Sequence, residues 1–335
     1  MSANPSKPAD IWTLGDLSTP WSIHVVVTLR IAQHIAEGRH QIDDLARAAG
    51  ADSDSLHRVL RHLVRHGIFE ETSVGLFTLN DAARPLLDDG VVLGFDLDSF
   101  GGRMARAWST LLTAVRTGRP AYHEVFGRPF WEDLAAHPEI AARFDALMGP
   151  QGHGTPDPDV LLSGDWTSVR TVVDVGGGTG TLLAEVLRAH PAVRGILVDQ
   201  PGTIARADPL LREAGLIGRV TLAPQTFFDP LPAGADLYLL KSVLGDWPDR
   251  EAEMILTRCA EAARPGGRVV LDNEVSPDSD GGPAPELLMM VLVGGRARSL
   301  SEFRPLAHRA GLEVAAAGKR RSGRFTVECV PAGKP

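Results

Sequence analysis

The sequence has little cysteine and no excess of positive charge. Cys259 and Cys329 are its only two cysteines in 335 residues, and both lie in apolar stretches without metal-ligand spacing. A disulfide framework and a structural zinc site are therefore excluded, and we expect buried thiols in a reducing cytoplasm. Lys and Arg number 34 against 42 Asp and Glu, a net charge of -8. This balance opposes non-specific binding to nucleic acid or anionic membranes and suits a neutral or cationic small molecule.

Long hydrophobic runs are also missing. No segment approaches the ~20 apolar residues needed to span a bilayer, and the N-terminal MSANPSKPADIW lacks the apolar centre of a signal peptide. We therefore expect a soluble cytoplasmic protein that does not act at a membrane. The length predicts two domains at about 150 residues each, and the 35 glycines and 24 prolines indicate many turns and linkers.

The first hundred residues predict an all-α domain with a winged-helix pattern. Residues 21–34 are strongly apolar, and two short amphipathic helices are expected over 42–49 and 53–66, the second capped by Ser53. A two-stranded hairpin is expected over 68–79. Helix, turn, helix and hairpin in this order form a winged helix, which we place in residues 1–95.

A winged helix raises the alternative of DNA binding. Arg58 and Arg61 lie on its third helix and favour that alternative. The acidic chain and the hairpin residues Glu70 and Glu71 oppose it. The very apolar segment 25–31 instead suggests a dimer interface. We therefore predict that this domain pairs two copies of the chain and has no nucleic-acid partner.

A second helical region follows and leads to a linker. Residues 96–160 predict further helices, among them 103–116 and 130–147, and 149–158 (GPQGHGTPDP) is incompatible with regular structure. This region is expected to connect the domains and to contribute to the acceptor site, together with residues 286–294, whose methionines suggest an apolar, adaptable wall.

Residues 161–335 predict a parallel βαβ sheet covered by helices on both faces. In this part of the sequence, short apolar segments typical of strands alternate with segments that have the periodicity of helices. The fold class is therefore α/β, preceded by the all-α domain. Strands are expected over 171–175, 195–199, 220–223, 235–241, 268–272 and 325–330.

A glycine-rich loop marks the most informative point of the sheet. In VVDVGGGTG an apolar strand runs into Gly176, Gly177 and Gly178, and a helix follows, so a ligand is expected at the carboxyl end of this strand. A dinucleotide motif requires Gly or Ala at the sixth position, which Thr181 occupies. Asp199 ends the next strand, where a carboxylate can accept hydrogen bonds from ribose hydroxyls. Together these features predict a nucleoside ligand.

Several motifs in order resemble one enzyme family. VVDVGGGTG, LVDQP, FFDPLPAGADLYLLKSVLGDWPD, EAARPGGRVVLD and GGRARSLSEF are similar to segments of the S-adenosylmethionine (SAM)-dependent O-methyltransferases of plant phenolic and bacterial polyketide metabolism, and FWEDL and FDALM to segments of the bacterial members. The match looks most like the anthracycline-tailoring subgroup. The resemblance implies a Rossmann-like class I methyltransferase domain, SAM as cofactor, a homodimer formed through the N-terminal domain, and a small aromatic or polyketide-type acceptor.

The resemblance also implies which residues contact SAM. Gly176 and Gly178 fall where the loop meets the methionine part of SAM, and Asp199 where the ribose is held. Thr226 and Phe227 fall beside the adenine. The full set implied is Trp131, Met148, Gly176, Gly178, Asp199, Gln200, Thr226, Phe227, Lys241 and Trp247.

The chain departs from the family at its catalytic base. Phenol-methylating members have His before Asp-Trp, and Gly245 stands there in this chain, while Asn273 and Ala297 fall at the acids that orient that His. The resemblance therefore implies a methyltransferase that works mainly by proximity and orientation. Asp246 and His153 are the candidate catalytic replacements. Weaker candidates for gripping the acceptor are His123, Arg296 and Arg298.

Two other functions remain open from the sequence. A SAM-binding tailoring enzyme of the same subgroup can act without transferring the methyl group, as a hydroxylase, decarboxylase or cyclase. A winged-helix regulator that senses a metabolite through a degenerate methyltransferase domain is more distant. Release of S-adenosylhomocysteine during acceptor turnover distinguishes methyl transfer from both.

Overall fold

The computed structural model describes residues 10–149, 155–263, 265–280 and 286–333. The chain divides into two compact units, residues 1–105 and 106–335. Within the described ranges, no helix is long and apolar enough to cross a membrane.

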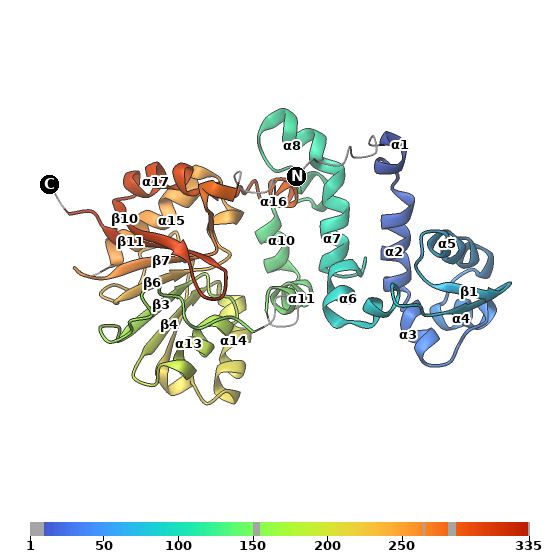
Figure 1. Ribbon diagram of the computed structural model, residues 1–335, viewed down its shortest axis with the longest axis horizontal. Coiled ribbons are helices and arrows are strands. Elements are labelled where there is room, and N and C mark those ends of the chain that lie inside the picture. Colours follow the sequence, from blue (N-terminus) through green and yellow to red (C-terminus); the bar gives the residue numbers. More distant parts are fainter. Residues whose placement is uncertain (1–9, 150–154, 264, 281–285, 334–335) are drawn as a thin grey trace, which may run out of the picture. The chain divides into compact units, whose positions relative to one another are not determined.

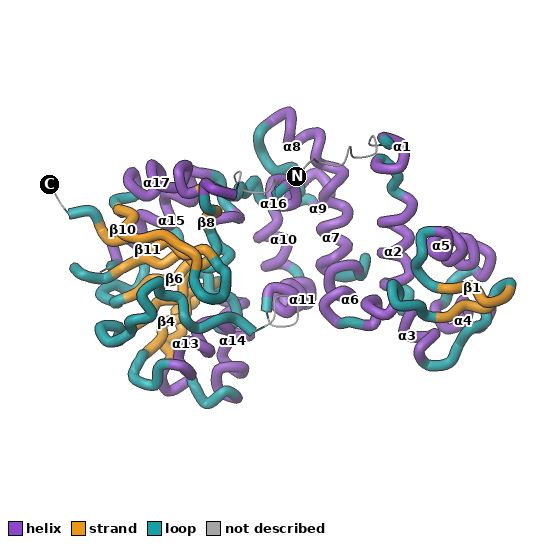
Figure 2. The backbone as a smooth tube through the Cα atoms, in the orientation of Figure 1, coloured by secondary structure: helices purple, strands orange, loops and turns teal. Residues whose placement is uncertain are grey.

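The N-terminal unit consists of short helices and a small hairpin (Figure 2). Its hydrophobic core includes Leu45, Leu60 and Phe77, each with no exposed surface. The predicted helix–turn–helix–hairpin pattern is confirmed. The elements are α1 (Ile11–Leu14), α2 (Ser18–Thr28), α3 (Ile31–Ala36), α4 (Ile42–Ala49), α5 (Ser53–Arg65), β1 (Glu70–Ser73), β2 (Leu76–Thr78), η1 (Arg84–Leu87), α6 (Asp89–Phe95) and α7 (Phe100–Ala107), the last of which crosses into the second unit.

Two local details of this unit differ from the sequence prediction. The apolar stretch 21–34 is divided between α2 and α3, because Arg30 between them adopts a left-handed backbone with φ 56°. The cap of α5 is Asp52 and not Ser53, since the Asp52 carboxylate accepts a hydrogen bond from the Ser55 N–H at 2.9 Å. The helix therefore begins at the predicted residue, but one residue earlier in the chain caps it.

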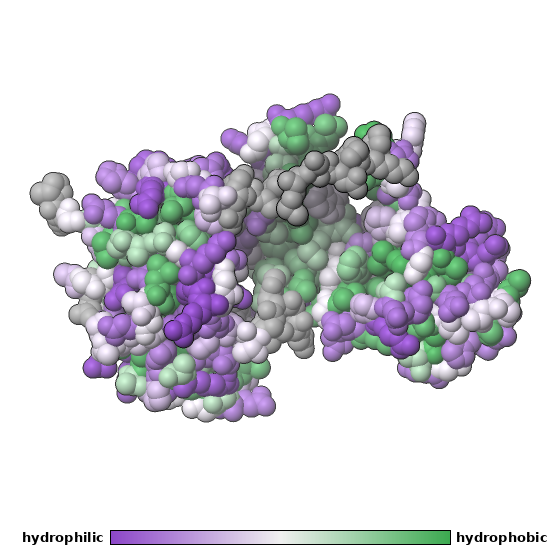
Figure 3. All heavy atoms as spheres, viewed as in Figure 1, coloured by the Kyte–Doolittle hydropathy of each residue, from purple (hydrophilic) through white to green (hydrophobic). Residues whose placement is uncertain are grey.

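The cations on α5 have acidic partners within the same unit. Arg58 pairs with Asp54, and Arg61 lies 3.6 Å from Glu71. His57 Nε2 lies 3.0 Å from the other oxygen of Glu71. Figure 3 accordingly shows a hydrophilic surface over α5. The positive charge that suggested DNA contact is thus partly balanced by neighbouring carboxylates.

The C-terminal unit begins with helices and continues as a sheet with helices on both faces (Figure 1). Its first part contains η2 (Trp108–Thr110), α8 (Leu111–Thr117), α9 (His123–Phe126), α10 (Phe130–Ala136) and α11 (Pro138–Met148). The second part contains β3 (Thr171–Val175), α13 (Thr181–Ala189), β4 (Arg194–Asp199), α14 (Pro201–Glu213), η3 (Ile217–Arg219), β5 (Val220–Pro224), β6 (Leu237–Leu240), η4 (Leu244–Asp246), α15 (Asp249–Ala262), β7 (Arg268–Asp272), β8 (Val275–Ser276), η5 (Asp278–Asp280), α16 (Leu287–Leu292), β9 (Arg298–Ser299), α17 (Leu300–Arg309), β10 (Leu312–Lys319) and β11 (Phe325–Pro331).

The main sheet of the described residues has seven strands in the order β10-β11-β7-β6-β3-β4-β5. Strands β3 to β7 run parallel, and β10 and β11 form an antiparallel edge. The predicted α/β fold is confirmed, although the sequence analysis missed β10. Because the strand order reverses beside β3, the carboxyl ends of β3 and β6 border the crevice where such sheets bind ligands.

Helices α15 and α17 cover one face of the sheet, and α13 and α14 cover the other (Figure 1). Both faces are apolar, so the strands are buried, as a doubly covered parallel sheet requires. In the helical part, a 3₁₀ turn at Trp108–Thr110 interrupts the helix predicted over 103–116, and His137 separates α10 from α11. Leu112 and Val115 leave an apolar surface on α8, visible in Figure 3.

Candidate functional site

In the glycine loop after β3, Gly177 is tightly packed and the backbone of the following Gly178 is open. Gly176 and Gly178 have φ values of 68° and 60°, which favour glycine. A Cβ on Gly178 would meet no atom of the described residues within 4 Å, whereas one on Gly177 would lie 2.5 Å from the carboxyl group of the buried Asp174. Gly177 is thus required for packing, a role that the sequence analysis did not assign. Gly178 leaves room for a ligand against the backbone.

Asp199 holds the glycine loop at the end of β4. Its two carboxylate oxygens accept hydrogen bonds from the Gly178 N–H at 2.8 Å and from the Gln200 N–H at 2.7 Å. Burial raises the pKa of Asp199, and these hydrogen bonds oppose the rise. Gln200 itself is exposed and precedes α14. The acid predicted to hold a ribose therefore lies directly beside the loop predicted to bind the methionine part of SAM.

Aromatic rings from three segments gather around Trp247. The rings of Trp131 and Trp247 are nearly parallel, with centroids 6.2 Å apart, and Phe227 and Phe228 meet Trp247 edge-on at 5.8 and 4.9 Å. A Cβ on Gly176 would lie 3.3 Å from the Phe227 ring, so this cluster borders the glycine loop. Such rings can cover a purine face or a cationic sulfur. The predicted residues Trp131, Gly176, Phe227 and Trp247 are thus brought together.

The remaining predicted cofactor residues occupy different surroundings. Burial raises the pKa of Asp174 to about 7, and the charge of Lys241, which follows β6, partly opposes this rise. The Thr226 hydroxyl accepts a hydrogen bond from the Phe228 N–H at 3.3 Å and so orders the turn before the aromatic pair. Met148 ends α11 with 40% of its surface exposed, and no described contact joins it to the aromatic cluster.

An ion pair that the sequence analysis missed connects the helical part to the sheet. Arg206 on α14 donates to the Asp145 carboxylate on α11 at 2.6 Å. Asp145 is also close enough to Asp199 for its charge to raise the pKa of Asp199. The pair fixes α11 beside the carboxyl end of β4. No local sequence pattern links two residues that are this far apart in the chain.

Carboxyl groups surround Gly245, the residue that the sequence resemblance aligns with the family's base. Glu274 accepts hydrogen bonds from the N–H groups of Val243, Leu244 and Gly245 at 2.5, 3.0 and 3.3 Å. In the described ranges, a Cβ on Gly245 would have one neighbour within 4 Å beyond the adjoining residues, the Oε2 atom of Glu286 at 3.8 Å. Position 245 therefore faces a carboxylate.

The acids near Gly245 have raised pKa values. Burial is the main cause that raises the pKa of Asp246 to about 8, and the charges of Glu274 and Glu286 add to it. Burial likewise raises the pKa of Glu274 to about 7. At neutral pH Asp246 is therefore largely protonated, which suits a hydrogen-bond donor better than a base.

The raised pKa of Asp246 predicts a pH-dependent change in stability for Asp246→Asn. Because the folded state holds this proton between pH 4 and pH 8 and the unfolded state does not, the ionisable carboxyl lowers stability as pH rises through that window. We expect the Tm of the Asn variant, relative to that of the parent, to increase from pH 5 to pH 8. Each kcal/mol of difference in unfolding free energy corresponds to roughly 2–4 °C in Tm. Thermal unfolding at pH 5, 6, 7 and 8 measures this, and a constant difference contradicts it.

The two arginines considered for acceptor binding are engaged within the protein. Arg298 is 3% exposed and donates to the Leu244 and Trp247 carbonyls at 2.9 and 2.8 Å and to Asp249 at 2.9 Å. Arg296 pairs with Asp249 and Glu302. Arg298 therefore holds the segment around Gly245 in place, which departs from the expected role in gripping an acceptor.

The two candidate histidines do not join the cluster around Gly245. His153 lies outside the described residues. His123 is exposed at the start of α9, with no described contact to that cluster.

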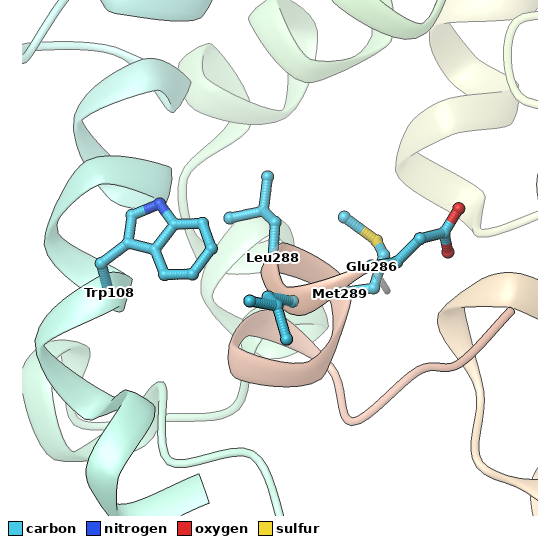
Figure 4. Close-up of a pocket in the computed structure, with 5 residues that line it drawn as sticks. Trp108, Glu286, Leu288 and Met289 are labelled. Carbon is cyan, nitrogen blue, oxygen red and sulfur yellow. The ribbon is translucent and has the colours of Figure 1, made fainter. Parts of the chain in front are cut away.

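A shallow cavity of about 440 Å³, largely open to solvent, lies between η2 and α16 (Figure 4). Trp108 and the first residues of α16 line it. In Figure 4, Trp108 faces Leu288, while the Glu286 carboxylate points away from Trp108. The wall is mostly apolar, as predicted for 286–294, although Leu292 is buried in the core. The residues that line the cavity are Trp108, Glu286, Leu287, Leu288 and Met289.

The residues at the carboxyl ends of β3, β4 and β6 fit a nucleoside that carries a cationic sulfur. Gly178 leaves space against the backbone, Asp199 supplies a carboxylate for hydroxyl groups, and the rings beside Gly176 can cover an aromatic base or a cation. Among the described residues, no group of three or more side chains has the chemistry and placement of a metal site.

Comparison with known proteins agrees with this geometry. The model of the O-methyltransferase domain matches residues 108–313, and that of the O-methyltransferase dimerisation domain matches residues 14–89. The chain is 42% identical to a 2,7-dihydroxy-5-methyl-1-naphthoate 7-O-methyltransferase of Streptomyces carzinostaticus, over 91% of this chain and 92% of that protein. It is 37% identical to the aclacinomycin 10-hydroxylase RdmB of Streptomyces purpurascens, over 96% and 90%.

A solved structure is similar over almost the whole chain. It is an O-methyltransferase (NcsB1) from neocarzinostatin biosynthesis in complex with SAM and 2-hydroxy-5-methyl naphthoic acid. The TM-score is 0.90 at 40% identity, and the match covers 97% of this chain and 100% of that one.

Proposed function

The chain belongs to the O-methyltransferase family, and we propose that it transfers a methyl group from SAM to a hydroxyl of a small aromatic, naphthoate-like acceptor. The resemblance drawn from the sequence motifs is confirmed, as are the SAM dependence and the Rossmann-like domain. One observation carries the proposal for the acceptor: the cavity beside α16 is walled by an indole and apolar side chains, which suit a flat aromatic ring.

The residues proposed to hold SAM each have a physical task. Gly176 and Gly178 would admit the methionine part against the backbone, and Asp199 would accept hydrogen bonds from the ribose. Phe227 and Trp247 would cover the adenine. The other proposed members of the site are Trp131, Met148, Gln200, Thr226 and Lys241. When bound, SAM supplies a methyl group on a positively charged sulfur.

The proposed contribution of the chain is mainly the positioning of the acceptor. A phenol with a pKa near 10 is about one part in a thousand ionised at pH 7, which corresponds to about 4 kcal/mol. Holding the hydroxyl oxygen in line with the methyl group contributes about 7–11 kcal/mol, which exceeds that deficit. Methyl transfer is therefore feasible although Gly245 replaces the usual base.

The parts of the chain have distinct proposed roles. Residues 1–95 form the dimerisation domain, 96–160 connect it and shape the acceptor site, and 161–335 bind SAM. The match to a dimerisation domain supports a homodimer. The buried free thiols Cys259 and Cys329 are in keeping with a cytoplasmic enzyme.

Product analysis tests the proposed function. The purified chain is incubated with SAM and 2,7-dihydroxy-5-methyl-1-naphthoate, with 1,4-dihydroxy-2-naphthoic acid as a second acceptor. We expect S-adenosylhomocysteine and methylated acceptor in equal amounts. Conversion of an acceptor while SAM stays unconsumed contradicts methyl transfer and supports the non-methylating alternative. Neither acceptor being converted contradicts the acceptor class.

A further inference from the structure

We propose that the carboxylate of Glu286 accepts the proton of the acceptor hydroxyl, in place of the histidine that is missing at Gly245. The proposal rests on the proposed methyl transfer. It adds a catalytic residue that the sequence motifs do not reveal, because Glu286 lies outside all of them.

The first support is the position of Glu286 relative to Gly245. Among the described residues other than its chain neighbours, the Oε2 atom of Glu286 is the one atom within 4 Å of the place where a side chain at 245 would begin, at 3.8 Å. The segment that follows α16 also lies there, since a Cβ on Gly295 would be 2.1 Å from the Gly245 carbonyl oxygen. This close backbone contact keeps the segment after α16 against η4. The Glu286 carboxylate thus lies where the side chain of a base at 245 would project.

The second support is that Glu286 belongs to the cavity. Glu286 is one of the residues that line the cavity, at the start of α16, and its carboxylate extends away from the Trp108 wall (Figure 4). In the part of the chain that the structure describes, no hydrogen bond or ion pair engages its carboxylate. Both oxygens are consequently available to an acceptor hydroxyl.

The two neighbouring acids are less suited to the task. Glu274 already accepts three backbone N–H hydrogen bonds and lies in the interior. Asp246 has a pKa of about 8 and is largely protonated at neutral pH. Partial burial also raises the pKa of Glu286, which brings its basicity closer to that of a useful proton acceptor.

The acceptor O–H gives its proton to a Glu286 oxygen, and the hydroxyl oxygen forms a bond to the methyl carbon. The bond between that carbon and sulfur breaks, and its electron pair stays on sulfur, which becomes neutral. Glu286 then loses the proton to water.

Glu286→Gln tests the proposal, because it keeps the shape and removes the basic oxygen. We expect kcat with 2,7-dihydroxy-5-methyl-1-naphthoate to fall about 10²-fold, the low end for a positioned base. SAM affinity by calorimetry should stay within twofold of the parent. The loss should shrink for naphthols acidified by ring substituents, since they need a base less. Glu286→Asp should recover part of the activity.

Glu313→Gln on the exposed edge strand β10 is the matched control and should behave as the parent. The rate of the parent should rise with pH through one ionisation that Glu286→Gln lacks. A Gln variant within threefold of the parent, with an unchanged pH profile, overturns the proposal while leaving methyl transfer intact. If the parent itself forms no methylated product, the proposed function fails first and this inference falls with it.

Discussion

Replacing Asp199 by Ala should weaken SAM binding about 10²–10³-fold. Hydrogen bonds to a charged group contribute about 1.5–3 kcal/mol each, and the variant loses the carboxylate proposed to bind the ribose hydroxyls. It also loses the two hydrogen bonds that order Gly178 and Gln200. Both the lost ribose contact and the lost hydrogen bonds weaken the binding of SAM. The effect on SAM affinity should therefore exceed the effect on the stability of the folded protein.

Calorimetric titration with SAM and with S-adenosylhomocysteine measures the change. Asp199→Asn should lie between the parent and Asp199→Ala, because its amide oxygen can still accept one hydrogen bond. Asp208→Ala removes a carboxylate from α14 that pairs with Arg212, and it serves as the control with unchanged affinity. Equal affinities for the parent and the Ala variant would show that the ribose does not bind at the end of β4.

The sheet and the glycine loop could be predicted because their signals are local. An apolar run of β3 followed by glycines specifies a buried strand and a tight turn within a few residues, and Asp199 ends the next apolar run. Parallel strands align their carboxyl ends, so their terminal residues converge. By contrast, β10 contains three consecutive alanines, which carry little strand preference, and its pairing with β11 depends on tertiary contacts.

The acidic surroundings of Gly245 could not be predicted, because they arise from packing between distant segments. Glu286 reaches Gly245 across about forty residues of sequence, and Asp145 pairs with Arg206 across sixty-one. Neither contact has a periodic pattern or a motif. The resemblance to a family places the missing base at Gly245, but only the positions of α16 and η4 point to Glu286 as the carboxylate proposed to replace it.

Gly245→His introduced into the Glu286→Gln variant should raise kcat at least tenfold above that of Glu286→Gln alone. Gly245 is not in the left-handed region and has open space up to Glu286, so the backbone and surroundings admit a larger side chain. The new imidazole would start where the sequence resemblance places the base of phenol-methylating members, and a positioned His contributes about 10²–10⁴-fold.

The pH profile identifies the group responsible for this rescue. In Gly245→His/Glu286→Gln the rate should rise through a pKa near 6.5, the ordinary value of His. In Gly245→His alone, the adjacent Glu286 carboxylate should raise that pKa, because an opposite charge favours the protonated imidazole. Gly245→Ala in the Glu286→Gln variant is the control for filled space and should restore nothing. If His at 245 changes neither rate nor pH profile in either variant, the acceptor hydroxyl does not bind beside residue 245.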